Sequence, residues 1–323
     1  MDKVKKITYK IKRFDGEKEW YQEYELPYEE GKTILWALTK IREEQDPTLN
    51  FTAACRHAIC GSCAVRVNDN AFLACKTPLD ELLETFQTDT LTFKPLGNFE
   101  VVRDLVIDWK PPLEQIKVVK PWLIPTDQGS PEKGFIQSEE DYHRIASPTD
   151  CILCGVCTSE CGQLNVNEDV YLAPYMLNKA YRFAVDSRDA APQEHIRPVL
   201  ENNLWKCIHC MNCVTKCPKQ IDLSKEIAYL RQESIKMGEV DNLGARHAFA
   251  FHDDVRNKGR LNEMTLPIKT EGLVKTMTKR VPFALRMITK GKINPLHMPK
   301  EIEGIQGVRK IYKFAKEQEM KKQ

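Results

Sequence analysis

The chain has 323 residues, of which 42% are hydrophobic and 29% charged, and its formal net charge is +2. This composition is ordinary for a globular protein, and the length allows two compact domains with an appendage. No uncharged stretch approaches the roughly 20 predominantly apolar residues of a membrane-spanning helix, so we expect that the chain does not cross a membrane by itself.

The charge is distributed unevenly along the chain. Residues 239–323 carry 18 Lys and Arg against 10 Asp and Glu. Because neither a dense basic tract nor a nucleic-acid-binding motif accompanies this excess, it predicts no nucleic-acid partner. It favours a docking surface for a protein partner or for membrane headgroups.

The first 110 residues predict a small domain of strands and one helix. Residues 7–11 alternate apolar and polar side chains, which is typical of a strand and not of a signal peptide, so the expected location is the cytoplasm. A turn at Asp15-Gly16 precedes a second strand, and apolar residues at helical spacing over 34–41 follow Thr33, a suitable N-cap. With the cysteine loop that follows the helix, these elements suit a β-grasp domain of the plant-ferredoxin type over residues 1–110.

The remainder of the chain predicts helices. Prolines favour an extended connector over residues 111–134, because each one disfavours helix at the residue before it. Residues 135–237 have a helical pattern that contains two copies of C-x2-C-x2-C-x3-C, with a helix expected near Ala173–Val185 between them. Residues 238–323 predict a basic helical C-terminal extension. The expected fold class is α+β, in which the β-grasp domain is followed by an all-α domain of the bacterial-ferredoxin type and this extension.

All twelve cysteines fall in three clusters at metal-ligand spacings, which favours metal ligation over disulfides. The first set has the spacing C-x4-C-x2-C with a fourth cysteine further on, the plant-type arrangement for a 2Fe-2S cluster: Cys55, Cys60, Cys63 and Cys75. One loop can then aim backbone N–H groups at the sulfurs, and Gly61 permits a close approach. Four thiolates also suit zinc, but structural zinc sites usually come as two paired short motifs.

The two later runs match the bacterial two-cluster pattern, in which the fourth cysteine of each run ligates the other cluster. That rule gives two 4Fe-4S ligand sets: Cys151, Cys154, Cys157 and Cys217 for one cluster, and Cys161, Cys207, Cys210 and Cys213 for the other. The alternative for Cys210 is a small buried residue beside a 3Fe-4S cluster. His57 and His209 lie between ligands and could tune redox behaviour, but four thiolates per site favour exposed bystanders.

The rest of the sequence offers no catalytic residues. We find no nucleotide-binding loop, no paired carboxylates for acid–base work and no nucleophile arrangement, so substrate chemistry is expected on another chain. The basic, apolar-striped stretch Leu273–Lys290 could rest on a membrane surface. A helical face packed on its own domain or on a partner is the alternative.

The order of the cysteine sets resembles the iron-sulfur subunit of the succinate dehydrogenase and fumarate reductase family. The matching segments are Cys55-Arg56, Ile59–Ala64, Leu73–Cys75, Asp104–Asp108, Lys120–Leu123, Cys151–Cys154, Tyr181–Phe183 and Asp186–Asp189. By this resemblance the chain relays electrons between a flavoprotein subunit, with FAD and the succinate/fumarate site, and a membrane-side quinone-binding subunit. The resemblance also implies a peripheral place on the cytoplasmic side of the cell membrane, with carriage to the periplasmic side on a co-transported partner left open.

Two departures from the family pattern indicate which class within the family the chain resembles. Most members hold a 3Fe-4S cluster with a non-ligand residue where this chain has Cys210, and a Pro and Trp-rich stretch where it has Gly162–Val166. With the long tail, in which Ala245–His247 is faintly similar to a heterodisulfide reductase subunit, these changes resemble the class whose membrane-side partner is cysteine-rich and heterodisulfide-reductase-like. The alternatives are a subunit of another oxidoreductase, of heterodisulfide or glycolate type, and a zinc scaffold without redox function.

Overall fold

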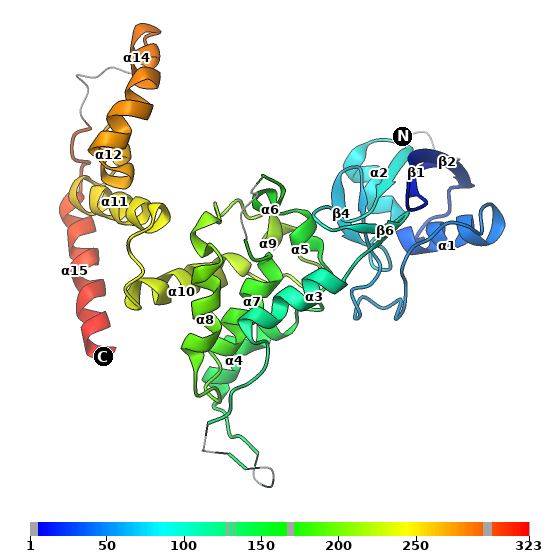
Figure 1. Cartoon of the computed structure of the whole chain (residues 1–323), viewed down its shortest axis with the longest axis horizontal. Helices are drawn as coiled ribbons and strands as arrows, with labels where there is room; N and C mark the ends of the chain where they lie inside the picture. The colour runs from blue at the N-terminus through cyan, green and yellow to red at the C-terminus, as the bar shows by residue number, and fades with distance from the viewer. Residues whose placement is uncertain are drawn as a thin grey trace. The chain divides into compact units, whose positions relative to one another are not determined.

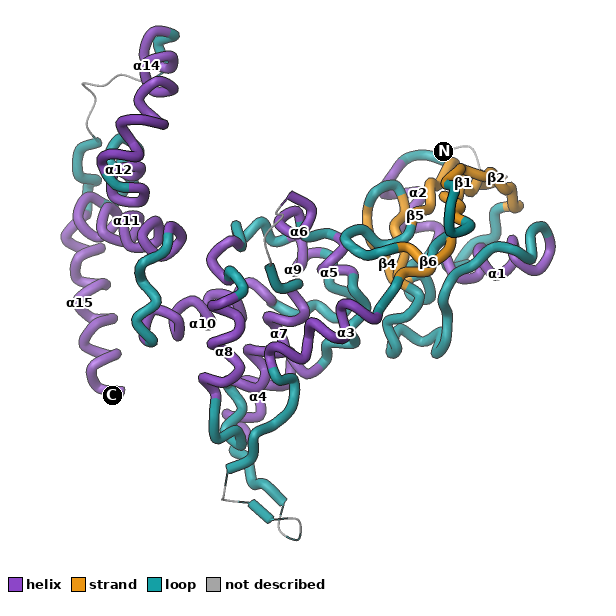
Figure 2. Tube along the Cα trace, in the orientation of Figure 1, coloured by secondary structure: helices purple, strands orange, loops and turns teal. Residues whose placement is uncertain are grey.

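The computed structural model describes residues 6–126, 129, 130, 132, 134–166, 171–292 and 299–322. They form a mixed α+β structure with an N-terminal sheet domain and a helical remainder (Figures 1 and 2). The chain divides into two compact units, residues 1–233 and 234–323, which are described separately. The finer domain boundaries expected from the sequence stay predictions.

The N-terminal sheet has five strands in the order β2-β1-β5-β3-β4. β1 runs antiparallel to β2 and parallel to β5, and β3 runs antiparallel to β4 and β5. The strands and the two helices between them are β1 (Lys6–Phe14), β2 (Glu19–Pro27), α1 (Ile34–Glu44), β3 (Ala64–Val67), β4 (Asn70–Leu73), α2 (Leu79–Phe86) and β5 (Thr90–Lys94). A separate pair of strands follows, β6 (Val101–Arg103) and β7 (Val106–Ile107).

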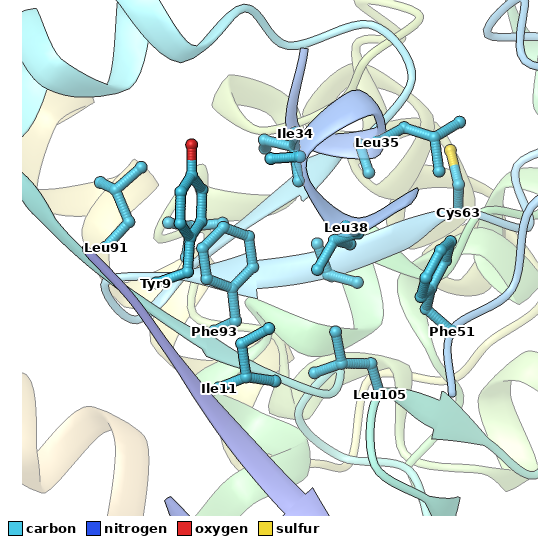
Figure 3. Close-up of a cluster of buried hydrophobic side chains, with 14 of the residues drawn as sticks. Tyr9, Ile11, Ile34, Leu35, Leu38, Phe51, Cys63, Leu91, Phe93 and Leu105 are labelled. Atoms are coloured by element: carbon cyan, nitrogen blue, oxygen red, sulfur yellow. The ribbon is translucent and has the colours of Figure 1, made fainter. Parts of the chain in front are cut away.

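The core of this domain lies between the sheet and α1. The alternation predicted for the first strand is confirmed, and Tyr9 packs its ring against Phe93 with 5.8 Å between ring centroids. The predicted helix is also confirmed, and the Thr33 side chain accepts a hydrogen bond from the Trp36 N–H at its start. Figure 3 shows the α1 side chains in one cluster with the sheet residues and Cys63. The first cysteine set is therefore attached to a rigid core.

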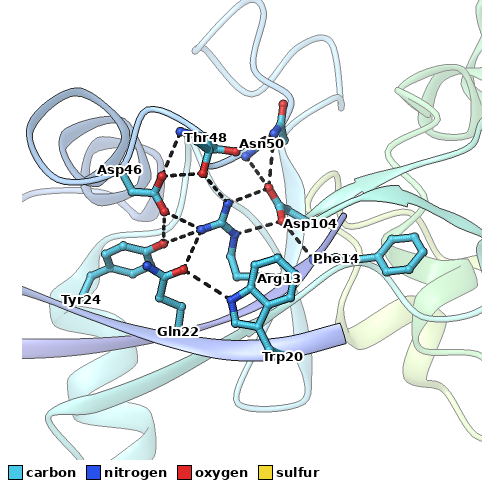
Figure 4. A network of polar contacts seen from close by, with 9 residues as sticks. All are labelled: Arg13, Phe14, Trp20, Gln22, Tyr24, Asp46, Thr48, Asn50 and Asp104. Atoms are coloured by element: carbon cyan, nitrogen blue, oxygen red, sulfur yellow. Dashed lines mark hydrogen bonds and ion pairs between the residues drawn. The ribbon is translucent and has the colours of Figure 1, made fainter. Parts of the chain in front are cut away.

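A buried charge network centred on Arg13 joins β1 to the loops around the core (Figure 4). The guanidinium donates hydrogen bonds to Asp104 at 2.9 Å, to Asp46 at 2.5 Å and to the Tyr24 hydroxyl at 2.6 Å. Asp104 also accepts from the Asn50 N–H at 2.8 Å. Because buried charges are stable only when they are paired, this network fixes the chain that leads into the first cysteine loop.

Helices make up most of the rest of the first unit. They are α3 (Lys110–Ile116), η1 (Lys117–Val119), α4 (Glu139–Thr149), α5 (Val156–Ser159), α6 (Gly162–Val166), α7 (Pro174–Ala184), α8 (Pro192–Glu201), η2 (Leu204–Lys206), α9 (Asn212–Thr215) and α10 (Leu223–Lys236), whose last residues belong to the second unit. α7 matches the helix expected near Ala173–Val185 and packs against α4, α5 and α8.

The prediction of an extended connector after residue 110 is wrong for its first part. α3 and η1 occupy residues 110–119. Pro111 and Pro112 lie in the first turn of α3, where a missing N–H costs nothing because no helical acceptor precedes it. Residues 120–126 are free of helix, and residues 127, 128, 131 and 133 of the connector lie outside the described residues.

The second unit is helical where it is described. Its helices after α10 are α11 (Leu243–Lys258), α12 (Leu266–Glu271), α13 (Leu273–Lys275), the π-helical turn η3 (Thr276–Arg280), α14 (Val281–Thr289) and α15 (Ile305–Lys322). α11 contacts α12 and α15, and the buried Asp254 on α11 binds the Lys269 ammonium and the Asn262 N–H. No helix in the described ranges is both long enough and apolar enough to cross a membrane.

Candidate metal centres

The first cysteine set lies on the loop between α1 and β3 and just after β4. Cys55 Sγ accepts three hydrogen bonds of 3.3–3.5 Å from the backbone N–H groups of His57, Ile59 and Cys60. Cys75 Sγ accepts from the Ala58 N–H at 3.2 Å, and Cys63 Sγ accepts from the Cys75 N–H at 3.4 Å. Successive N–H groups that point inward form a concavity suited to a negatively charged group.

Backbone conformation produces this concavity. Arg56, Ala58 and Gly61 have positive φ angles of 58°, 56° and 74°, which turn the loop back on itself. L-residues seldom adopt this region, and such strain persists where the surroundings require it. The loop conformation therefore directs its N–H groups at the sulfurs of Cys55 and Cys75.

The thiols of this set differ in acidity. The Ser62 hydroxyl, 3.2 Å from Cys60 Sγ, lowers the pKa of the Cys60 thiol to about 6, while burial raises the pKa of the Cys63 thiol to about 12. Metal binding requires thiolates, and the positive charge of a bound metal compensates the negative charge of a buried thiolate. Cys60 is exposed and Cys63 is buried, so one edge of the site faces solvent.

Gly61 brings the first centre against the second. A Cβ at this position would lie 2.7 Å from the Ile152 carbonyl oxygen and 2.9 Å from Cys154 Cα. Cys154 belongs to the same buried cluster as the core of the sheet domain. The sequence indicated a close approach at Gly61, but it did not indicate that the neighbour is the first helical cysteine run.

Four cysteines line one pocket in the helical part: Cys151, Cys154, Cys157 and Cys217. The crossed-ligation rule assigns these four to one cluster. Apolar residues and Tyr175 complete the wall, and burial raises the pKa of the Cys154 thiol to about 11. Asn178 also lines this pocket, and its amide donates to both carboxylate oxygens of Glu226 at 3.1 Å.

The other four cysteines line a second pocket: Cys161, Cys207, Cys210 and Cys213. Cys210 is the exposed member of this group, and burial raises the pKa of the Cys213 thiol to about 12. His209 lines the same pocket, and burial lowers the pKa of its imidazole. His57, by contrast, is exposed on the first loop.

The donor sets fit multi-iron clusters. The thiols of each helical set line one pocket whose walls are mostly apolar. Sets of four Cys thiolates are the ligands that hold 2Fe-2S and 4Fe-4S clusters.

Fold and sites together define an iron-sulfur electron-transfer protein. A family described as a 2Fe-2S iron-sulfur cluster binding domain matches residues 8–114, and one described as a 4Fe-4S dicluster domain matches residues 147–221.

Three known proteins show to which iron-sulfur proteins the chain is similar. The 8-methylmenaquinol:fumarate reductase iron-sulfur subunit of Wolinella succinogenes is 44% identical over 89% of this chain and 91% of its own length. The mitochondrial succinate dehydrogenase iron-sulfur subunit of Candida glabrata is 36% identical over 70% of this chain and 90% of its own. The solved Sdh1 complex of Mycobacterium smegmatis contains a chain that shares the fold, with a TM-score of 0.66 and 22% identity over 72% of this chain and 96% of that one.

The chain belongs to the family of succinate dehydrogenase/fumarate reductase iron-sulfur subunits. This confirms the predicted membership, the electron-transfer role and the 2Fe-2S and 4Fe-4S cofactors. Members of the family are subunits of oxidoreductase complexes that contain several chains. The zinc-scaffold alternative is therefore abandoned.

Proposed function

We propose that this chain relays electrons between a flavoprotein subunit, which carries FAD and the succinate/fumarate site, and a membrane-side quinone-reactive subunit. The proposed ligand sets are Cys55, Cys60, Cys63 and Cys75 for 2Fe-2S, Cys151, Cys154, Cys157 and Cys217 for one 4Fe-4S cluster, and Cys161, Cys207, Cys210 and Cys213 for the other. When bound, the clusters supply one-electron carriers. The observation that carries this proposal is the packing of Gly61 on the Cys154 backbone, which joins the first site to the second.

Exposed apolar side chains beside the first and the last cysteine set support two docking sites for partner subunits. Beside the first set, Ile59 is 66% exposed, and beside the last set, Ile208 is 67% and Met211 41% exposed. Exposed apolar side chains next to a redox centre suit a partner that must approach closely, because the apolar core of an interface excludes water. We assign the flavoprotein to the Ile59 end and the membrane-side subunit to the Ile208 end.

We further infer the finer architecture and the partner classes. The sheet domain (1–110) is taken as a β-grasp ferredoxin domain, residues 135–237 as an all-α ferredoxin domain after the connector, and residues 238–323 as a helical extension. The Wolinella relative is named for 8-methylmenaquinol and fumarate, which supports a quinol of the menaquinol kind. The proposed membrane-side partner is cysteine-rich and heterodisulfide-reductase-like, and the complex is peripheral to the cytoplasmic face.

Purification of the native complex tests this proposal. Anaerobic preparation should give about ten irons per chain, the sum for one 2Fe-2S and two 4Fe-4S clusters. A flavoprotein that interconverts succinate and fumarate should co-purify, and the isolated chain should not oxidise succinate. Zinc in place of iron would contradict the cofactor assignment. A co-purifying flavoprotein without succinate or fumarate activity would contradict the assigned reaction.

A further inference from the structure

The stretch from Gly272 to Lys292, here called the α13–α14 segment, has an unusual side-chain pattern. It contains six Lys and Arg residues and no Asp or Glu. The apolar residues Leu273, Val274, Met277, Val281, Ala284, Leu285 and Ile288 recur at spacings of three and four. Lys275, Lys279, Arg286 and Lys290 recur at the same helical spacings, offset by two residues. Residues three or four apart share a helix face, so the segment has an apolar and a basic face.

Most of the apolar face is uncovered. Four of its side chains are largely exposed, with exposed fractions of 60% for Leu273, 79% for Val274, 58% for Met277 and 56% for Leu285, while Val281 and Ile288 are half-buried. α12 contacts α13 and η3, yet leaves these side chains open. Contiguous apolar surface on a folded unit marks an interaction site.

The basic face is also available. Within the described residues, Arg280 is the member of the six that forms an ion pair, with Glu271 at 2.5 Å. The side chains of Lys275, Lys279, Arg286 and Lys290 are exposed. A segment that carries one sign of charge without internal compensation attracts a surface of the opposite sign.

We propose that the α13–α14 segment lies flat on an anionic membrane surface. Its apolar side chains would enter the boundary between headgroups and acyl chains, and its Lys and Arg side chains would contact lipid phosphates, as in interfacial amphipathic helices. A protein partner fits less well, because the centres of protein interfaces are depleted of Lys, whereas this segment has four. The proposal holds whichever reaction the complex catalyses, since it depends on the second unit alone.

Vesicle flotation of the full-length, cluster-loaded chain under anaerobic conditions tests the proposal. Wild-type chain should float with vesicles of 70:30 phosphatidylcholine and phosphatidylglycerol, and much less with phosphatidylcholine alone. The variant K275Q/K279Q/R286Q/K290Q should lose at least about tenfold in partitioning to the anionic vesicles. The matched control K10Q/K32Q/K117Q/K225Q removes four exposed charges from the first unit and should partition like wild type.

A second variant tests the apolar face. V274S/M277S/L285S replaces exposed side chains, so the fold should be retained, and unchanged spectra of the clusters verify this. It should lose partitioning to both kinds of vesicle. Failure of wild-type chain to float, or equal flotation of wild type and both variants, would overturn the proposal. If the variants lose a membrane-side protein subunit from the complex while flotation is unchanged, the face is a protein interface and the proposal is wrong.

Discussion

Glu226→Gln should remove a pH-dependent loss of stability. Glu226 on α10 is 4% exposed, and burial raises the pKa of its carboxyl from 4.5 to about 7. Below pH 4.5 the carboxyl is protonated in both the folded and the unfolded chain, so its ionisation does not lower the free energy of unfolding. Between about pH 4.5 and 7 the Glu226 carboxyl is ionised in the unfolded chain and still protonated in the folded chain, so the free energy of unfolding falls as the pH rises. At 1.36 kcal/mol for each pKa unit, the loss reaches about 3 kcal/mol above pH 7.

Gln at this position has the same shape and no charge to bury. Asn178 Nδ2 already donates to residue 226, and Asn178 Oδ1 is a buried acceptor with no partner among the described residues. Rotation of the Asn178 amide would let its Oδ1 accept the new Gln N–H while its Nδ2 donates to the Gln carbonyl oxygen, so the two side chains should stay hydrogen-bonded.

The measurement is the thermal midpoint of the cluster-loaded chain, recorded anaerobically at pH 5 and pH 8 at one scan rate. The E226Q variant should unfold several degrees above wild type at pH 8, and this gain should shrink at pH 5. The control is E43Q, which removes an exposed carboxyl on α1 and should show no such difference. Equal midpoints of E226Q and wild type at pH 8, or a gain that does not depend on pH, would refute the reasoning.

Three further substitutions test the core, the contact between centres and the last ligand set. Arg13→Met leaves Asp104, which is 1% exposed, without its cation, and should destabilise the chain by about 3–5 kcal/mol in denaturant unfolding; a loss under 1 kcal/mol would contradict this. Gly61→Ala combines a φ of +74° with a clash against the second cysteine run, so it should lower the midpoint more than Gly31→Ala, which has a φ of +73° and open space. Equal effects would mean that the contact is unimportant. Cys210→Ser should produce a 3Fe-4S signal in electron spin resonance of the oxidised chain and leave the other clusters unaltered. A stoichiometric 3Fe-4S signal already present in wild type would show that Cys210 is no ligand.

The elements that the sequence predicted well are those specified by a local period. β1 alternates because one of its faces is buried against α1, and both α1 and α7 carry apolar side chains at helical spacing. The cysteine runs could be recognised because ligand spacing is local within each run, and the exchange of the fourth cysteine between the two later runs came from the bacterial two-cluster pattern. The prolines led to a wrong prediction at α3, because the rule that the residue before a proline avoids helix is weakest in the first turn of a helix.

The features that the sequence did not predict arise from tertiary packing. Nothing distinguishes Glu226 from the exposed glutamates of the chain until α7 and α10 pack together and close over it. Likewise, the glycine at position 61 indicated that a side chain would not fit there, but not which backbone segment would block it. Both depend on residues far away in the sequence, which a local period cannot specify.

The contacts between the two ferredoxin-like parts have a common origin, which bears on how the relay keeps its geometry. Gly61 is next to Cys60, and Lys76, next to Cys75, donates to the Pro218 carbonyl 3.0 Å away. Asn98 Nδ2 donates to the carbonyl of Cys161 at 3.1 Å. The first two contacts join residues at or next to proposed ligands on both sides, and the third joins the Asn98 loop to the proposed ligand Cys161, so residues close to the ligands help to set the separation of the centres. Substitutions on remote surfaces should therefore change docking without changing transfer within the chain.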